Sequence, residues 1–366
     1  MRRRQACTTA AVASGATAAT FPLWWPGDSG AESDKCSSRA ALIGFSDELD
    51  KKKFQGREVY GLSSLALSGP SGALSLADNS PPMLYSLSLG EPGQKPDPRI
   101  TAMTPLRRDD GRAYGADDFD GEATVLEKDG EHVLVASESG PSVSRFNVVT
   151  GKMVADFPVP ERFRTSGKGD AAANAIFESM ALSPDGRHLY VGLEEPLRGD
   201  GSNQGRELIR ILRYTQGPGG QYVPDAQFAY ETDSGLRLAD LTTVGNDRFL
   251  ALERGYTEGQ GNSVHIYEIS FAGLPDVSSA ESLATEQSNA FTPKTEVVDV
   301  GKCPPSGATS KQTQANPLLE NAEGMALGPR LTQGAYEGRR PLYLVTDDNN
   351  SAEQTTRFYA LAVTGL

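Results

Sequence analysis

The sequence has few of the residues that common catalytic and metal sites require. It holds three histidines and three cysteines in 366 residues, with no Cys-x-x-Cys pair and no Cys/His cluster at zinc spacing. It has no Gly-x-Ser-x-Gly elbow, no Arg-His-Gly phosphatase motif and no P-loop, so serine-hydrolase and phosphohistidine mechanisms are unsupported. His132, His188 and His265 fall inside expected strands, and we interpret them as structural.

Long apolar runs and basic clusters are also missing. No run of 18 apolar residues exists, so no membrane-spanning helix is expected. A net charge of −13 and a pI near 4.8 argue against nucleic acid and anionic membranes as partners. An acidic composition suits a protein that binds divalent cations, although solubility alone also favours acidic residues.

The N-terminus has the pattern of a targeting segment. Arg2-Arg3-Arg4 precedes a stretch of small residues, which predicts a signal over 1–31, of secretory or twin-arginine type, and a secreted or periplasmic protein. A disordered tail is the alternative. A linker is expected over 32–40. Removal of Cys7 with the signal would leave Cys36 and Cys303, which are compatible with one disulfide.

Short strands and turns alternate from about residue 40 onward, and five times a polar or acidic residue opens an apolar strand while a second closes the next. The pairs are Ser64/Asp78, Glu122/Glu138, Glu178/Glu194, Asp240/Glu253 and Glu323/Asp347. Two pairs are centred on Asp-Gly turns at Gly130 and Gly186. We therefore expect the members of a pair to face each other across an antiparallel ladder, where like charges are destabilising. This predicts that a cation neutralises them.

The pairs recur at about 60 residues, with four strands per repeat, which is the pattern of a β-propeller. We predict an all-β fold over 41–366 with five four-stranded antiparallel blades. A sixth, degenerate blade near 35–60 is the alternative count, and a β-sandwich would not explain the period. The apolar run 41–45 is expected to complete the last blade and close the ring. First strands line the channel of a propeller, so the acids should converge on one rim.

Several strings resemble the phytase-like family, also described as having esterase-like activity of phytase. They are Asp120-Gly121-Glu122-Ala123, Ser137-Glu138-Ser139-Gly140-Pro141, Phe177-Glu178-Ser179-Met180, Glu194-Glu195-Pro196-Leu197, Leu252-Glu253-Arg254-Gly255, Ala322-Glu323-Gly324-Met325 and Asp347-Asp348-Asn349-Asn350. The resemblance implies a β-propeller and an ester or phosphoester hydrolase built on Glu and Asp. Ser179, where the family usually has Gly, and Ser64, in place of an acid, depart from the pattern.

Hard oxygen ligands predict calcium (Ca²⁺) as the cofactor, with Mg²⁺ or Mn²⁺ as alternatives. The predicted metal ligands are Glu122, Glu138, Glu178, Glu194, Asp240, Glu253, Glu323, Asp347 and Asp348. The predicted catalytic residues are Glu122, Glu178, Glu323 and Arg254, the last to hold a phosphate or carboxylate. In the alternative, the acids cap strand ends and Arg254 pairs with a glutamate of a neighbouring blade.

These observations predict a monomeric, secreted, cation-dependent phosphoester hydrolase that acts on a small molecule over the channel mouth. Two alternatives stay open. One is a non-catalytic propeller that binds a ligand or a protein and uses its acids to join blades. The other is a lactonase-like or carboxylester hydrolase, because metal propellers can activate either electrophile.

Overall fold

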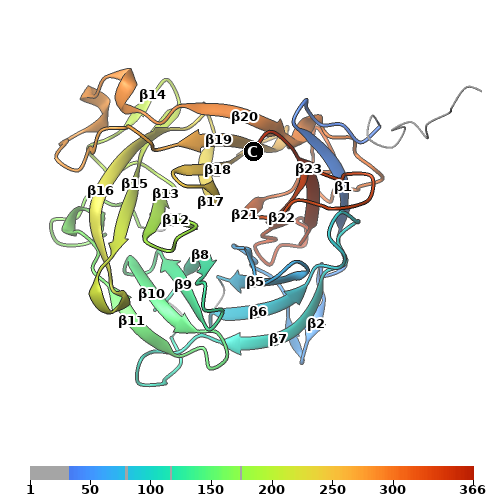
Figure 1. Cartoon of the computed structure of the whole chain (residues 1–366), viewed down its shortest axis with the longest axis horizontal. Coiled ribbons are helices and arrows are strands. Elements are labelled where there is room, and N and C mark those ends of the chain that lie inside the picture. The colour runs from blue at the N-terminus through green and yellow to red at the C-terminus, as the bar shows by residue number, and fades with distance from the viewer. Residues whose placement is uncertain (1–32, 79–80, 116–117, 174) are drawn as a thin grey trace, which may run out of the picture.

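Five four-stranded antiparallel sheets form a ring around a central channel (Figure 1). The computed structural model describes residues 33–78, 81–115, 118–173 and 175–366. The predicted signal over 1–31 lies outside the described residues. The all-β propeller with five blades is confirmed, and no helix in the described ranges is long and apolar enough to span a bilayer.

The blades follow one another along the chain. Blade I contains β4 (Ala66–Leu67), β5 (Gly72–Ala77), β6 (Met83–Ser88) and β7 (Arg99–Pro105). Blade II contains β8 (Gly121–Leu126), β9 (His132–Ser137), β10 (Ser142–Asn147) and β11 (Met153–Phe157). Blade III contains β12 (Phe177–Leu182), β13 (His188–Leu193), β15 (Arg206–Gln216) and β16 (Tyr222–Glu231), with the short β14 (Ser202–Asn203) paired to β15.

Blade IV contains β17 (Arg237–Gly245), β18 (Arg248–Thr257), β19 (Gly261–Ser270) and β20 (Lys294–Asp299). Blade V contains β21 (Ala322–Leu327), β22 (Arg340–Thr346), β23 (Phe358–Val363) and β1 (Ala40–Ser46). A small hairpin joins β2 (Lys53–Phe54) to β3 (Arg57–Glu58). The described helices are single 3-10 turns: η1 (Glu161–Phe163), η2 (Pro218–Gly220), η3 (Leu283–Thr285), η4 (Ser288–Ala290) and η5 (Val300–Lys302).

The N-terminal strand closes the ring, as the sequence predicts. β1 pairs antiparallel with β23, from Ala40 opposite Val363 to Ser46 opposite Phe358. In Figure 1 the blue β1 lies beside the red β23, so the two ends of the propeller share one sheet. The segment expected to hold a sixth blade contributes only β1 and the β2–β3 hairpin, so the count is five. β1 thus supplies the fourth strand of blade V and covers β23, which would otherwise be the outer edge of that blade.

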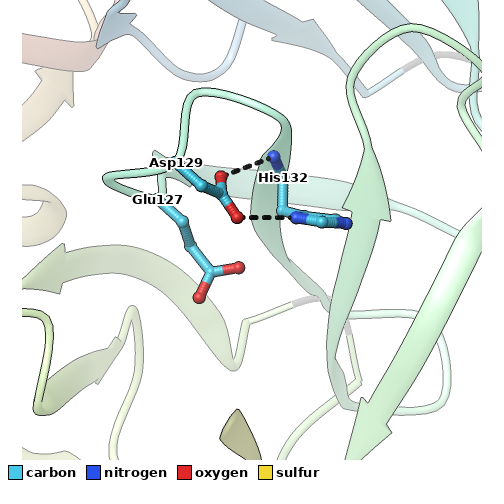
Figure 2. Close-up of side chains that lie close together, drawn as sticks. All are labelled: Glu127, Asp129 and His132. Atoms are coloured by element: carbon cyan, nitrogen blue, oxygen red, sulfur yellow. Dashed lines mark hydrogen bonds and ion pairs between the residues drawn. The ribbon is translucent and has the colours of Figure 1, made fainter.

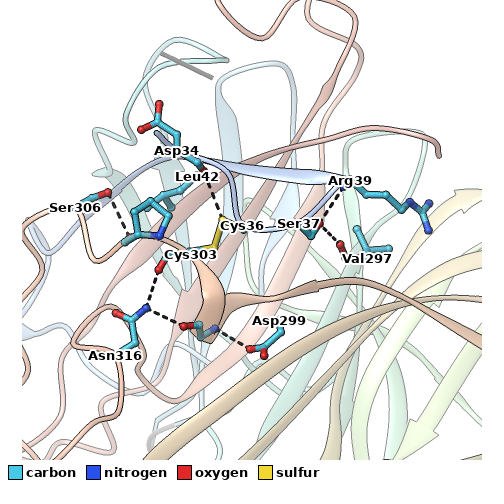
Figure 3. The surroundings of a disulfide bond; sticks show 12 residues. Asp34, Cys36, Ser37, Arg39, Leu42, Val297, Asp299, Cys303, Ser306 and Asn316 are labelled. Atoms are coloured by element: carbon cyan, nitrogen blue, oxygen red, sulfur yellow. Dashed lines mark hydrogen bonds between the residues drawn. A yellow bond between two sulfur atoms is a disulfide. The ribbon is translucent and has the colours of Figure 1, made fainter. Parts of the chain in front are cut away.

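A disulfide and a buried arginine fasten this closure. Cys36, just before β1, bonds to Cys303 after η5, with an S–S distance of 2.03 Å (Figure 3). The amide of Asn316 donates to the Cys303 carbonyl at 2.8 Å. Arg357, fully buried before β23, binds both carboxylate oxygens of Asp47 at 2.7 and 2.8 Å. Its guanidinium also donates to three carbonyls of the segment between η5 and β21.

Apolar faces of adjacent blades pack against each other to form the core. The strands β9, β13 and β22 are buried along most of their length. Each is an inner strand of its blade, and the two faces of the blade pack against the two neighbouring blades. Between blades III and IV, Tyr190, Phe249 and Phe271 pack with ring centroids 4.6–5.1 Å apart. At the Asp-Gly turns, Gly130 and Gly186 have φ of 69° and 79°, as the expected hairpins require.

The covalent lock predicts a measurable loss of stability on its removal. The double variant Cys36→Ala/Cys303→Ala should lose about 2–4 kcal/mol of unfolding free energy, because the bond closes a very long loop in the unfolded chain. Guanidinium denaturation of the variant measures this loss. Dithiothreitol should cause a similar loss in the wild type and none in the variant. A wild type whose denaturation midpoint ignores dithiothreitol would show that the bond does not hold the ring.

Candidate functional site

The first strands of blades II, III, IV and V each carry a β-bulge where they reach the channel mouth. The register shifts between Gly121 and Ala123, between Phe177 and Ser179, and between Ala322 and Gly324. The bulged residues are therefore Glu122, Glu178 and Glu323. The expectation that the members of each pair face each other is wrong, because a bulge residue has no partner directly opposite and its side chain is re-aimed.

The bulge also changes which residues are equivalent between blades. In blade IV the shift lies between Leu238 and Asp240, so Ala239 occupies the bulge and Asp240 lies one residue beyond it. In the second strand, Arg254 lies opposite Arg237 and holds the place that an acid takes in the other blades. Those acids are Asp78, Glu138, Glu194 and Asp347, and the backbone N–H of each donates to the segment before the first strand.

Eight carboxyl groups gather at this mouth and are called the acid ring: Asp78, Asp120, Glu122, Glu138, Glu178, Glu194, Glu323 and Asp347. In three groups of the ring, one oxygen of each member lies within 4.8 Å of the others. The groups are Glu122–Glu178–Glu323, Glu138–Glu178–Glu194 and Asp78–Asp120–Glu122. Strand ends of blades I, II, III and V thus bring together acids that are far apart in the sequence.

Burial and mutual repulsion disfavour the charged form of these acids. Burial first, and then the charges of Glu178, Asp78, Asp120 and Glu323, raise the pKa of Glu122 well above its ordinary value. Burial likewise raises the pKa of Glu138 to about 7, although the Ile176 N–H donates to its carboxylate at 2.8 Å. The surrounding protein groups therefore do not fully balance the negative charge of the ring.

Cations contact the ring from blade IV. The Nη2 of Arg254 lies 2.9 Å from Glu323, 3.3 Å from Glu178 and 3.4 Å from Glu194. Burial alone would lower the pKa of Arg254, but these three carboxylates raise it, so the guanidinium stays charged. The alternative that Arg254 pairs with glutamates of neighbouring blades is confirmed.

Two acids of the ring, Asp120 and Glu122, have no such compensation among the described residues. No described Lys, Arg or His forms an ion pair with Asp120 or Glu122. Burial raises the pKa of Asp120, which shares a hydrogen bond with Glu122. This side of the ring is where a bound cation would relieve the most repulsion.

Three predicted metal ligands lie outside the acid ring and bind the protein instead. Asp240 accepts hydrogen bonds from the backbone of Leu241 at 2.7 Å and of Met325, in blade V, at 2.6 Å. Glu253 accepts from Tyr230 and from Lys294. The prediction that Asp240 and Glu253 occupy the same positions as the ring acids is therefore wrong by one residue. In blade IV those positions belong to Ala239 and Arg254.

Asp348, the third of these ligands, is fully buried and pairs with Lys51. Its second oxygen accepts from the Gly61 N–H at 3.4 Å. Because neighbouring side chains of a strand end point apart, only Asp347 of the Asp-Asp string reaches the ring.

Ser179, which departs from the family pattern, is accommodated by a glycine on the facing strand. Ser179 pairs with Gly192, and a Cβ at Gly192 would lie 2.3 Å from the Ser179 hydroxyl. The bulge at Glu178 is therefore retained. Ser64 hydrogen-bonds Thr124 of blade II at 2.9 Å and joins blades I and II.

Asp120 and Arg237 are residues of this region that were not predicted from the sequence. Asp120 belongs to the string Asp-Gly-Glu, two residues before Glu122, so a signal for it was present. Arg237 lies 3.4 Å from Glu194 and 2.5 Å from Glu195. The sequence did not indicate Arg237, because β17 begins at this residue and the apolar run that predicted the strand begins only at Leu241.

A second group of possible ligands lies at the β8–β9 turn (Figure 2). There Asp129 accepts from the His132 ring at 2.8 Å, and Glu127 lies beside them. Glu127 is already bound by Arg145 through two hydrogen bonds of 2.6 and 2.9 Å. The His188 ring hydrogen-bonds Thr215, and the His265 ring hydrogen-bonds Glu296. Each of the three histidines thus contacts a side chain of a turn or of the adjacent strand.

Comparison with solved structures gives matches of low similarity. The catalytic domain of a GH62 α-L-arabinofuranosidase from Coprinopsis cinerea has a TM-score of 0.45 and 12% identity, over 89% of this chain and 97% of that one. Hydrazine synthase of Kuenenia stuttgartiensis has a TM-score of 0.39 and 13% identity, over 81% and 77%. These values give no argument about function.

Sequence comparison is more specific. A search of curated proteins returns no significant match. The family model "Phytase-like: Esterase-like activity of phytase" matches residues 57–350, which include every member of the acid ring together with Arg237 and Arg254. The chain belongs to the phytase-like family.

Proposed function

We propose that the protein is a secreted hydrolase of small phosphoesters that depends on a divalent cation held by the acid ring. The observation that carries the proposal is the gathering of eight mostly buried carboxyl groups, of which Asp120 and Glu122 form no ion pair with any described Lys, Arg or His. Buried carboxylates at this density are costly unless a cation or protons compensate them. Near neutral pH a divalent cation is the stronger compensation.

The donor set suits a hard cation. Every ring ligand is a carboxylate, and no thiol or imidazole belongs to the described ring, which favours Ca²⁺, Mg²⁺ or Mn²⁺. Asp78, Asp120 and Glu122 would hold it first, on the side away from Arg254. When bound, such a cation supplies Lewis-acid polarisation of a phosphoryl oxygen and lowers the pKa of a water molecule.

The chain's own residues supply the remaining functions. Glu138, whose pKa burial raises to about 7, can exchange a proton near neutral pH and is the general base of the proposal. The Ile176 N–H fixes one of its oxygens and leaves the other to accept the proton. Arg254 places a permanent positive charge beside the ring, where the negative charge of a phosphoester can be stabilised.

Part of the acid set favours the second candidate, a non-catalytic propeller whose acids join blades. Asp240 and Glu138 each accept backbone N–H groups of another blade. These contacts stabilise the ring whether or not it reacts. They leave Asp120 and Glu122 unexplained, so we favour the hydrolase. The disulfide supports an oxidising compartment and hence secretion.

Chelation and ring variants test the proposed function. Hydrolysis of p-nitrophenyl phosphate and bis-p-nitrophenyl phosphate should stop in EDTA and return with excess Ca²⁺, Mg²⁺ or Mn²⁺. Glu122→Gln and Asp120→Asn should each weaken cation binding at least tenfold by calorimetry, or about 1.4 kcal/mol. Glu296→Gln on the outer strand β20 is the matched control and should change neither. Turnover that survives EDTA, or no turnover with any cation, would overturn the proposal.

The raised pKa values predict how the stability of the metal-free protein depends on pH. The pKa of Glu138 is about 7 in the folded protein against an ordinary value of 4.5. The folded state thus binds more protons than the unfolded state in this window, and stability falls as pH rises. In EDTA the melting temperature should drop between about pH 5 and 8, and Ca²⁺ should raise it more at pH 8 than at pH 5. A flat or rising melting temperature in EDTA would contradict the electrostatic account.

A further inference from the structure

A cavity of about 390 Å³ opens beside the acid ring, where blades III and IV meet. Glu207, Arg237, Arg254 and Tyr256 line it together with the backbone of 235–236 and 255. Its volume lies in the range of small-molecule sites. Arg254 belongs to both the cavity and the ring, because its Nη2 contacts Glu323. A molecule in this cavity would therefore lie next to the ring carboxylates.

Two arginines of this cavity face each other in the sheet. Arg237 of β17 and Arg254 of β18 are direct cross-strand partners. Like charges in such positions are destabilising. Glu207 is the single carboxylate among the residues that line the cavity. Glutamates of the rim already pair with both arginines, and a bound anion would further reduce the repulsion between the two guanidiniums.

Both guanidiniums have donors to offer. The three ion pairs of Arg254 with the ring all use Nη2, so its Nη1 forms no ion pair with a described carboxylate. The Arg237 side chain is 46% exposed, and it pairs with the buried Glu194 at 3.4 Å and with the partly exposed Glu195 at 2.5 Å. The pair with Glu195 is solvent-accessible and contributes little, so this part of the guanidinium can turn to a ligand at small cost.

An aromatic side chain completes the cavity. The β18–β19 hairpin extends beyond the rim to the pair Thr257 and Gly261, and it carries Tyr256. Tyr256 is 59% exposed, one of the few large apolar side chains of the described residues at the surface. Exposed aromatic surface beside two guanidiniums suits a ligand with an anionic group and an organic part.

We propose that this cavity binds the phosphate group of an organic phosphoester and so delivers it to the acid ring. Arg237 and Arg254 donate to its non-bridging oxygens, since each guanidinium fork matches two oxygens. Tyr256 packs against the organic part. The inference rests on the proposed function, because it names the substrate class and the side from which it reaches that same ring.

Binding of a phosphonate that cannot be hydrolysed tests the inference. Calorimetry with phenylphosphonate, in the presence of Ca²⁺, should show binding to the full-length protein. Arg237→Ala should weaken it at least tenfold, and Arg237→Lys should restore only part of the loss. Arg206→Ala is the matched control, because Arg206 is also about half exposed and pairs with a glutamate, Glu231, at 3.4 Å. Tyr256→Ala should weaken phenylphosphonate but not methylphosphonate.

The outcomes separate this inference from the hydrolase proposal. If Arg237→Ala changes neither phosphonate binding nor the KM for p-nitrophenyl phosphate, the inference is overturned while the hydrolase proposal stands. If benzoate binds as tightly as phenylphosphonate, the assignment to phosphate is overturned. If phosphonate binding depends on Arg237 but no phosphoester is hydrolysed, the cavity is supported and the hydrolase proposal fails.

Discussion

Repulsion among carboxylates at the channel mouth is the constraint on which the rest of the structure depends. In blades II, III and V, a bulge at the start of the inner strand re-aims a glutamate toward the mouth. Burial then raises the pKa of these acids because little water remains to solvate their charges. A ring that carries such repulsion must be closed firmly. The β1–β23 pairing, the Cys36–Cys303 bond and the buried Arg357–Asp47 pair provide that closure.

The mouth is symmetric in backbone but not in charge. Blade IV has Ala239 in its bulge and Arg254 in place of a second acid, so positive charge enters from one side. Asp120 and Glu122 form no ion pair with any described Lys, Arg or His. In the proposed site, a cation would neutralise these carboxylates on one side of the mouth. Arginines would bind an anionic substrate on the other side.

Features set by local sequence could be predicted, and features set by register could not. The Asp-Gly turns at Gly130 and Gly186, the repeat of about 60 residues and the closing strand all follow from short-range patterns. The bulge adds one residue to a strand without disturbing its apolar pattern. The cross-strand pairing predicted from that pattern was therefore wrong by one residue beyond the bulge. That single error moved Asp240 and Glu253 into the expected ring and hid the equivalence of Arg254 with the acids.

The central claim, that the acid ring holds a cation, is tested most directly by anomalous diffraction from crystals grown with Mn²⁺ or Ca²⁺. The account predicts a peak bound by carboxylate oxygens of Asp120 and Glu122, at about 2.3–2.6 Å for Ca²⁺. It also predicts that Arg254 stays on the opposite side, with Glu323. A ring whose carboxylates contact only Arg254 and water at millimolar cation would contradict the claim.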